Sequence, residues 1–430
     1  MNDSTNSSDA SSTTVQQLEG QSKFPPETTT IGMLGSGQLG RMFAFAAHRL
    51  GYRVHVFSPE SDSPAGQVAD FETVADYEDI AALGEFARQI DVATLEFENI
   101  PVASLRILEQ QVPVRPGPGV LETTQDRLKE KQALSQAGFP VTEFREVCSL
   151  AELKSAFDSD TATHKFAAIL KTASWGYDGK GQSRIQTADD LEPAWKTLQC
   201  DRAILEAFVD FECELSVIAV RSVTGEVACY DPVRNEHHNH ILSRSVSPSG
   251  LPPEIVAEAK QIATAIVDSL SVIGVMCVEM FLTKQNRLVV NELAPRPHNS
   301  GHLTIEAHAT SQFEQQVRAV CGLPLGETRQ VRPATMSNLL GDLWEQGQPD
   351  FPKIMAMPDT QLHLYGKSAA RNGRKMGHVT TLGESAKEAA DKADRAMEIL
   401  RGKQSVDRSE NAGAPNDRPQ DRPSTAKTVS

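Results

Sequence analysis

The sequence predicts an α/β region followed by an α+β region, and three observations support this fold class. Short apolar runs alternate with helical patterns over Thr30–Phe97, which is typical of a parallel sheet with helices on its faces. From Phe144 onward strands and helices mix without that alternation, which favours antiparallel pairing. Between these regions the run Gly117–Gly119 interrupts the chain, so a second domain is expected to begin near it.

The first region is predicted to be a Rossmann-like domain over residues 29–125. An apolar run that ends in glycines indicates the first strand, and apolar residues at helical spacing indicate the helix after it. Continued alternation predicts strands over 30–34, 52–57 and 91–97 and helices over 40–50 and 80–89. A charged amphipathic helix over 125–137, ended by Gly138 and Pro140, then opens the next domain.

The rest of the folded chain is predicted to form a larger domain over 126–325 and a small domain over 326–400. For the larger domain we expect a helix over 253–270 and strands over 167–171, 203–209, 214–221, 227–232 and on both sides of 284–287. For the small domain we expect strands over 335–340 and 361–366 and a helix over 385–400. Residues 1–28 and 401–430 are polar and are expected to be disordered tails.

Composition argues against two kinds of partner. The 430 residues hold 42 Lys and Arg against 57 Asp and Glu, and the net charge of −15 disfavours a general binder of nucleic acid or of an anionic membrane. The longest apolar stretches, such as 42–47, are far shorter than the roughly 20 residues that span a bilayer. The 6 cysteines are scattered with no C-x-x-C pair, which indicates reduced thiols and predicts a cytoplasmic protein.

A glycine turn with the pattern G-x-G-x-x-G, Gly35 to Gly40, lies between the first predicted strand and helix. Such a turn directs backbone amides and a helix N-terminus at a phosphate, so phosphate binding is the preferred interpretation. A dinucleotide would also need an acid at the end of the second strand, where Ser58 stands and Glu60 follows two residues later. A tight turn with only a structural role is the alternative.

A second glycine-rich segment, Gly176 to Gln182, follows the strand that ends at Lys171. Its three glycines favour a mobile loop that closes over phosphates and places Asp178 and Lys180 in the site. A lysine at the end of the preceding strand can reach nucleotide phosphates as a point charge. A solvated hairpin turn is the alternative.

The apolar strand Ile204–Val209 carries one acid, Glu206, and its backbone is a candidate for an adenine edge. Glu206 or Glu214 would accept hydrogen bonds from ribose or amino groups, and a solvated glutamate is the ordinary alternative. The run Glu236–His240 holds three histidines whose spacing does not converge on one metal ion. One of these histidines lining a site is the preferred interpretation.

Glu279 and Glu292 lie on two predicted strands joined by a turn. A two-residue turn at Gln285 and Asn286 makes the two carboxylates direct cross-strand neighbours. Like charges in that position repel, so a divalent cation between them is the expected resolution, and oxygen ligands favour Mg²⁺. An exposed pair screened by salt is the alternative. Asn291 would face the other side of an unbroken strand.

Two further polar clusters are candidates for substrate contacts. The run Asn291–His302 holds Arg296 and His298 in one segment interrupted by prolines. Lys367 and the basic run 374–378 form a positive cluster in an acidic protein, which suits a phosphorylated substrate. A solvated basic loop is the alternative for the second cluster.

Together these motifs resemble the ATP-grasp superfamily and, within it, the family of N5-carboxyaminoimidazole ribonucleotide synthases. The resemblance covers most of residues 29–385 and keeps the motifs in order and in spacing. It rests on the glycine turn with Arg41 and Met42, the loop 176–182, the runs 291–302 and 304–307, the segment 310–314 and the cluster from Tyr365 to His378. The sequence departs from the common pattern at Arg234, His240 and Leu303, where glutamate, glycine and an aromatic residue are frequent.

The resemblance implies a nucleotide site and a magnesium site. Arg127 and Lys171 would contact the ATP phosphates, Glu214 would take the ribose, and Glu279 and Glu292 would bind Mg²⁺. The residues implied for ATP are Arg127, Lys171, Gly176, Tyr177, Asp178, Gly179, Lys180, Gly181, Gln182, Glu206, Ala207, Phe208, Val209, Glu214, His237, Asn291 and Glu292.

For aminoimidazole ribonucleotide the resemblance implies contacts from Gly37, Gln38, Leu39, Tyr177, Lys367, Arg374 and Lys375, and catalytic roles for Asp178, Lys180 and Arg296. The implied reaction begins with attack of bicarbonate on the γ-phosphate of ATP. The resulting carboxyphosphate would carboxylate the exocyclic amine of the ribonucleotide in purine synthesis. The family also suggests a homodimer. The nearest alternative is formate-dependent glycinamide ribonucleotide transformylase, whose turn more often has glutamate in place of Gln38.

Overall fold

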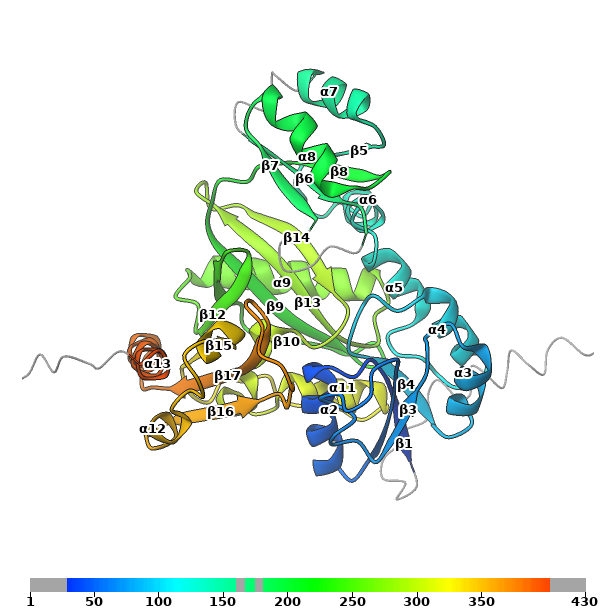
Figure 1. Ribbon diagram of the computed structural model, residues 1–430, viewed down its shortest axis with the longest axis vertical. Coiled ribbons are helices and arrows are strands. Elements are labelled where there is room, and N and C mark those ends of the chain that lie inside the picture. Colours follow the sequence, from blue (N-terminus) through cyan, green and yellow to red (C-terminus); the bar gives the residue numbers. More distant parts are fainter. Residues whose placement is uncertain (1–28, 160–166, 175–180, 403–430) are drawn as a thin grey trace, which may run out of the picture.

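The structure, a computed structural model, describes residues 29–159, 167–174 and 181–402. It contains three sheets, two of four strands and one of nine, with helices packed against them (Figure 1). One four-stranded sheet is parallel and the other two sheets are antiparallel, so the predicted combination of α/β and α+β regions is confirmed. None of the helices in the described part of the chain combines the length and the apolar content that a membrane span requires.

The N-terminal sheet has the strand order β3-β2-β1-β4 and is parallel throughout. Its elements are β1 (Thr30–Leu34), α2 (Gln38–Arg49), β2 (Arg53–Ser58), β3 (Phe71–Val74), α3 (Ile80–Ala87), β4 (Val92–Leu95) and α4 (Val102–Glu109). The predicted alternation is therefore confirmed, but the sequence analysis missed the edge strand β3. Three of its four residues are exposed, so it lacks the apolar pattern of a buried strand.

Two helices, α5 (Pro118–Thr124) and α6 (Arg127–Gln136), lead into a small antiparallel sheet with the order β5-β8-β6-β7 (Figure 1). Its strands are β5 (Phe144–Val147), β6 (Ala168–Thr172), β7 (Gln182–Ile185) and β8 (Ala203–Ala207). The helices α7 (Leu150–Ser159) and α8 (Leu191–Leu198) pack on this sheet through a core that includes Leu153, Leu170 and Leu191. The short helix η1 (Ala188–Asp190) joins β7 to α8.

The largest sheet has nine strands, in the order β14-β13-β9-β11-β12-β15-β17-β16 with β10 paired to β9. They are β9 (Phe211–Arg221), β10 (Val227–Cys229), β11 (Val233–His238), β12 (Ile241–Ser247), β13 (Gly274–Thr283), β14 (Leu288–Ala294), β15 (Ala334–Leu340), β16 (Thr360–Leu364) and β17 (Lys375–Leu382). Because β12 pairs with β15, the C-terminal strands continue the sheet of the preceding region. The domain boundaries near 125 and 325 stay predictions.

The remaining helices cover the large sheet and connect it to the N-terminal region. They are α9 (Pro253–Ser269), η2 (Asn299–Gly301), α10 (Thr304–Ala307), α11 (Gln312–Val320), η3 (Gly341–Trp344), α12 (Phe351–Met355) and α13 (Ala386–Leu400). On α11 the buried Gln316 donates from Nε2 to Thr94 Oγ1 of β4 at 2.8 Å and accepts from the Val275 amide of β13 at 2.6 Å. This side chain joins the N-terminal sheet to the strand that carries Glu279.

Candidate active site

The carboxylates of Glu279 on β13 and Glu292 on β14 are cross-strand partners, so the predicted pairing is confirmed. The predicted two-residue turn is wrong, because β13 ends at Thr283 and the Thr283 amide donates to the Arg287 carbonyl at 2.9 Å. A β-bulge next to Glu279 adds the residue that brings the two glutamates back into register. The longer turn and the bulge therefore compensate each other.

The same bulge changes the position of Asn291. Leu288, Val290 and Leu293 all belong to one apolar core, so their spacing of two and then three residues puts Asn291 and Glu292 on the opposite face. The expectation that Asn291 faces away from Glu292 is wrong, because the strand is not unbroken. The two side chains are available to the same site.

Two cations relieve the repulsion between the paired carboxylates. His298 Nε2 lies 3.0 Å from Glu279 Oε1, and Arg127 NH2 lies 3.6 Å from Glu292 Oε2. Burial opposes the charges of Glu279 and His298, but His298 outweighs burial for Glu279, and Cys277 together with Glu279 outweighs burial for His298. The pKa of Glu279 is lowered to about 2, and the pKa of His298, which also lies beside Cys277, is raised to about 10. Glu279 is therefore ionised.

Helix α6 delivers three charged side chains to this region. Its cap, the Asp126 carboxylate, accepts from the Leu128 and Lys129 amides, each at 3.0 Å. Arg127 then reaches Glu292, the Glu130 carboxylate accepts from the Leu293 amide at 3.1 Å, and Lys131 donates to the Val290 carbonyl at 3.1 Å. The sequence analysis missed Glu130 and Lys131, since nothing in a charged helix shows which face is buried.

Lys171 and Glu206 come together on the small antiparallel sheet. Lys171 Nζ lies 2.7 Å from Glu206 Oε2, and Lys131 Nζ lies 3.7 Å from Oε1 of the same carboxylate. Burial alone would raise the pKa of Glu206, but the two lysines outweigh it and lower the pKa. Glu206 is only 4% exposed, so the alternative of a solvated glutamate is wrong.

The predicted adenine edge offers fewer backbone donors than expected. The Ala207 amide donates to the Glu143 carbonyl at 2.9 Å, and the Phe208 amide donates to the Ala167 carbonyl at 3.0 Å. Glu206 lies within the ladder between β6 and β8. Within the described residues, the Val209 amide is thus the donor of this segment that a base could use.

Glu214 on β9 and His237 on β11 form an ion pair. Burial would lower the pKa of His237, but the adjoining Glu214 carboxylate raises it. His240 Nδ1 lies 3.2 Å from Nε2 of Gln182, the last residue of the predicted phosphate loop. His240 has a φ of 64°, in the left-handed region that favours glycine.

The glycine turn is already occupied by a protein carboxylate. The amides of Gly37 and Gly40 both donate to the side chain of the buried Glu96, the second at 2.9 Å. A Cβ at Gly37 would lie 2.8 Å from Glu96 Oε1, so the close approach requires glycine. The expectation that these amides bind a phosphate is wrong at Gly37 and Gly40, because Glu96 takes the place of the anion.

Arg296, predicted to be catalytic, forms an ion pair with Glu98 of the N-terminal region. Its NH2 lies 2.7 Å from Glu98 Oε1, and its Nε contacts the other oxygen. Burial alone would lower the pKa of Arg296, but Glu98 raises it. The sequence analysis missed Glu96 and Glu98, and the only available signal was their position directly after β4 in a parallel sheet, where polar groups tend to be functional.

The basic cluster from Lys367 to Lys375 is held by backbone carbonyls. Lys367 Nζ donates to the Lys375 carbonyl at 2.7 Å, and Arg374 NH1 donates to the Ala369 carbonyl at 2.8 Å. Gln67 Nε2 donates to the Gly366 carbonyl at 3.0 Å, which connects the cluster to the N-terminal region. The cluster and the glycine turn therefore lie on neighbouring parts of the molecule.

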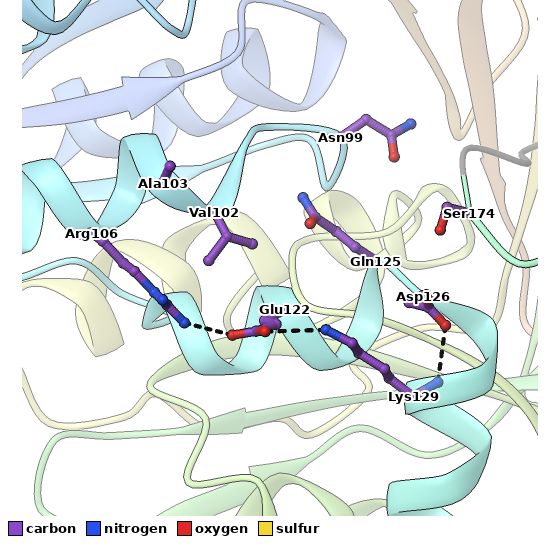
Figure 2. A pocket seen from close by; sticks show the side chains of 9 residues that line it. All are labelled: Asn99, Val102, Ala103, Arg106, Glu122, Gln125, Asp126, Lys129 and Ser174. Atoms are coloured by element: carbon purple, nitrogen blue, oxygen red, sulfur yellow. Dashed lines mark hydrogen bonds and ion pairs between the residues drawn. The ribbon is translucent and has the colours of Figure 1, made fainter.

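Five predicted residues, Gly176, Tyr177, Asp178, Gly179 and Lys180, lie outside the described residues. The described flank of the loop, Ser174, borders a cavity of about 340 Å³ between α4, α5 and α6 (Figure 2). Arg106 and Lys129 both pair with Glu122 in its wall, at 2.7 and 3.1 Å. Among the described residues, none of those predicted for ATP, metal or substrate lines this cavity.

Comparisons with known proteins identify the class and then the family. The ribonucleotide synthetase preATP-grasp domain matches residues 28–125, the ATP-grasp domain matches 132–313, and the phosphoribosylaminoimidazole carboxylase C-terminal domain matches 334–392. With the sheets described above, these matches define an ATP-grasp protein, in which one further domain precedes the ATP-grasp domain and another follows it.

The full-length relatives narrow the class to one family. The chain is 45% identical over 350 residues to N5-carboxyaminoimidazole ribonucleotide synthase of Bacillus subtilis, covering 81% of this chain and 90% of the relative. It is 44% identical over 377 residues to the bifunctional purine synthesis protein purC/E of Dictyostelium discoideum, covering 83% of this chain but 37% of that longer protein. The chain belongs to the N5-carboxyaminoimidazole ribonucleotide synthase family.

A solved structure agrees with this assignment. The N5-carboxyaminoimidazole synthase from Aspergillus clavatus, in complex with ADP and 5-aminoimidazole ribonucleotide, superposes with a TM-score of 0.80 at 29% identity. The match covers 87% of this chain and 99% of that one. The predicted ATP-grasp fold is thereby confirmed over nearly all of the described chain.

Proposed function

We propose that the chain catalyses the ATP-dependent carboxylation of 5-aminoimidazole ribonucleotide to N5-carboxyaminoimidazole ribonucleotide, a carbon–nitrogen ligation in purine synthesis. The observation that carries the proposal is the cross-strand pair of Glu279 and Glu292 facing Arg127, in a chain of this family. Such a group of charges suits phosphoryl transfer, where positioned cations take up the charge on the phosphoryl oxygens. A homodimer and a cytoplasmic location stay predictions.

We assign ATP to the space between the small sheet and the large sheet. Lys171 and Arg127 would contact the phosphates, Glu214 and His237 the ribose, and the Val209 amide the base. The loop Gly176–Gln182 would close over the phosphates and exclude water from the intermediate. This assignment is supported by the ion pairs that hold these side chains in place, Lys171 with Glu206, Arg127 with Glu292 and Glu214 with His237.

Mg²⁺ is assigned to Glu279 and Glu292. Two carboxylates with an amide oxygen from Asn291 on the same face form the oxygen donor set that suits this ion. When bound, the ion would neutralise charge on the ATP phosphates during transfer. Glu279 is held ionised by His298 in advance, so the ligand does not have to lose a proton first.

We assign the phosphate of the ribonucleotide to the basic cluster Lys367, Arg374 and Lys375 and to the Gln38 and Leu39 amides of the glycine turn. Glu96 occupies the Gly37 and Gly40 amides, but the amides of Gln38 and Leu39 lie at the N-terminus of α2 with no acceptor among the described residues. Such amides favour an anion. Tyr177, Asp178, Lys180 and Arg296 would surround the reacting amine.

The reaction would proceed in two steps. A bicarbonate oxygen attacks the γ-phosphorus, ADP leaves, and carboxyphosphate forms. The exocyclic amine of the ribonucleotide then forms a bond to the carboxyl carbon, inorganic phosphate leaves, and the amine loses a proton. Asp178 is the acid that the resemblance implies near the amine.

The experiment that tests this proposal measures ATP turnover in bicarbonate buffer with each candidate substrate. We expect strong stimulation by aminoimidazole ribonucleotide, and none by glycinamide ribonucleotide with formate or by NADH. Equal stimulation by glycinamide ribonucleotide and formate would favour the transformylase alternative and overturn the assignment. Labelled bicarbonate should enter the product, which a hydrolytic side reaction would not cause.

A further inference from the structure

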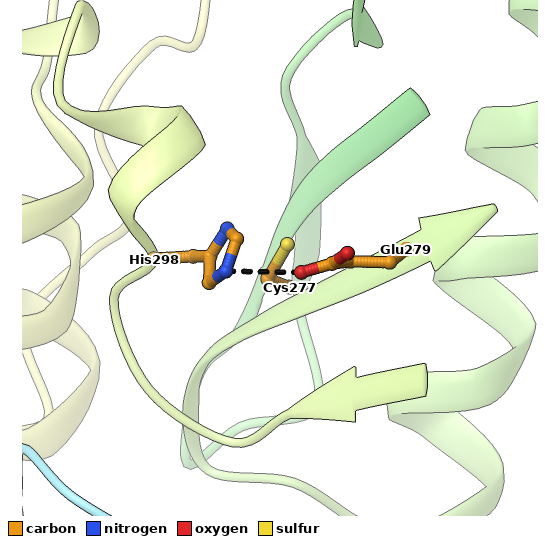
Figure 3. A group of neighbouring side chains, drawn as sticks. All are labelled: Cys277, Glu279 and His298. Carbon is orange, nitrogen blue, oxygen red and sulfur yellow. Dashed lines mark ion pairs between the residues drawn. The ribbon is translucent and has the colours of Figure 1, made fainter. Parts of the chain in front are cut away.

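Three side chains with different ligand atoms meet beside the assigned magnesium site (Figure 3). Cys277 and Glu279 are two residues apart on β13 and so point to the same face of the sheet. His298 reaches them from the segment that follows β14. One ligand atom from each residue lies within 4.8 Å of the other two. Neither the family assignment nor the proposed reaction uses Cys277.

The imidazole of His298 is oriented by a second contact. Its Nδ1 lies 2.8 Å from the hydroxyl of the fully buried Ser300, and its Nε2 lies 3.0 Å from Glu279 Oε1. The Ser300 amide also approaches Nδ1 as a donor, at 3.3 Å. Metal binding requires that Nδ1–H donate to the Ser300 hydroxyl and that the ion displace the proton that Nε2 shares with Glu279, after which the lone pair of Nε2 points toward Cys277 and Glu279. Metal-bound histidines are held in this way, with the distal nitrogen donating to an oxygen.

We propose that Cys277, Glu279 and His298 form a binding site for a thiophilic divalent cation such as Zn²⁺, and that this site overlaps the magnesium site through Glu279. Thiolate and imidazole ligands favour Zn²⁺, whereas Mg²⁺ prefers oxygen ligands alone. Three protein ligands leave a fourth position for water, as in open zinc sites.

The overlap has a consequence for activity, and this part rests on the proposed function. A cation held by sulfur and nitrogen draws Glu279 away from Glu292, so the carboxylate pair can no longer hold Mg²⁺ with the ATP phosphates. Zn²⁺ should therefore inhibit turnover, and excess Mg²⁺ should relieve the inhibition. Cys277 is completely buried, so small cations reach it more readily than bulky thiol reagents.

The binding test uses Co²⁺ as a spectroscopic substitute for Zn²⁺ and needs no substrate. Titration of the full-length protein should produce the near-ultraviolet charge-transfer absorption of a cobalt–thiolate bond. Cys277→Ala should abolish the band, while Cys321→Ala should retain it, because Cys321 is equally buried but lies in the N-terminal core. Cys277→Ser serves as the second variant if the alanine variant does not fold.

A wild-type spectrum without the band, or a band that persists in both Cys277 variants, would overturn the site. The overlap is tested separately through inhibition of ATP turnover. Cys277→Ala should raise the Zn²⁺ concentration for half inhibition by at least about tenfold relative to Cys321→Ala. Inhibition that excess Mg²⁺ does not relieve would overturn the overlap. Because cobalt binding is measured without ATP or ribonucleotide, failure of the site and failure of the proposed function give different results.

Discussion

Glu96 after β4 and Glu279 on β13 are two largely buried carboxylates that the protein stabilises in different ways. Glu96 accepts from the Gly37 and Gly40 amides, and burial raises its pKa despite these amides and the positive charges of Arg296 and Lys367. The Glu279 side chain is still 15% exposed, and His298 at 3.0 Å lowers its pKa to about 2. The backbone amides hold the Glu96 carboxylate in position without offsetting the cost of its burial. The full charge of His298 does offset that cost for Glu279.

This difference indicates a structural role for Glu96 and a ligand role for Glu279. Glu96 accepts from the Gly37 and Gly40 amides and forms no ion pair among the described residues, so it serves as the acceptor of the glycine turn. Glu279 is paired with a side-chain cation that a metal ion can replace. Four experiments test whether the two carboxylates differ in this way.

The largest effect is expected at the hairpin. Glu279→Gln and Glu292→Gln should each reduce kcat by roughly 100-fold or more, because each removes a ligand that supports phosphoryl transfer. Glu279→Gln should also destabilise the metal-free fold by about 3 kcal/mol, since His298 is left without its partner. Turnover assays and urea unfolding measure the two effects.

The matched control is Glu226→Gln, an exposed glutamate at the turn after β9. This substitution should change neither kcat nor the free energy of unfolding. If both hairpin variants bound Mg²⁺ and ATP as the wild type does, the carboxylate pair would be structural, and its contrast with Glu96 would disappear.

The next effect concerns the basic cluster beside the glycine turn. Lys367→Ala should raise the KM for the ribonucleotide by roughly ten- to 100-fold, because it removes a charge-assisted contact to phosphate. The KM for ATP should stay nearly unchanged. The exposed Lys387→Ala on α13 is the control. A change in the KM for ATP instead would assign this cluster to the nucleotide site.

A smaller effect is expected at Glu96. Glu96→Ala should lower the free energy of unfolding by about 1 to 3 kcal/mol, because the Gly37 and Gly40 amides lose their acceptor. The KM for ATP should not change. Urea unfolding with a parallel kinetic assay tests this, and a stable variant with a raised ATP constant would show that Glu96 belongs to the nucleotide site.

The smallest and sharpest test is the pH dependence of stability without metal. The raised pKa of Glu96 means that the wild type loses stability relative to Glu96→Gln as pH rises above 4.5, the ordinary glutamate value. The lowered pKa of Glu279 means the reverse: its contribution is present above 4.5 and is lost as pH falls toward about 2. The difference in free energy of unfolding between the wild type and each variant should be measured between pH 3 and 8. Its slope with pH should have opposite signs for Glu96→Gln and Glu279→Gln. Slopes of the same sign would contradict the comparison.

Local patterns in the sequence predicted the elements with strong apolar periodicity. The strand β1 and the helices α2 and α9 were expected close to their actual bounds, and β13 was expected before the turn at 284–287 without bounds of its own. The predictions omitted β3, β5, β7, β11, β12 and β17, which are either partly exposed or mixed in polarity. For such strands the pairing partners, rather than the local pattern, decide the conformation.

By itself the sequence determined which chemical groups the protein has and, at the Glu279–Glu292 hairpin, which of them are paired, because pairing across a short turn depends on nearby residues alone. Only the tertiary structure decided that Glu96, 59 residues beyond Gly37, occupies the glycine turn and that Lys131 reaches Glu206. The physical reason is that these contacts join distant segments. A buried charge takes its partner from whatever the fold brings near, and this is decided by how the sheets pack.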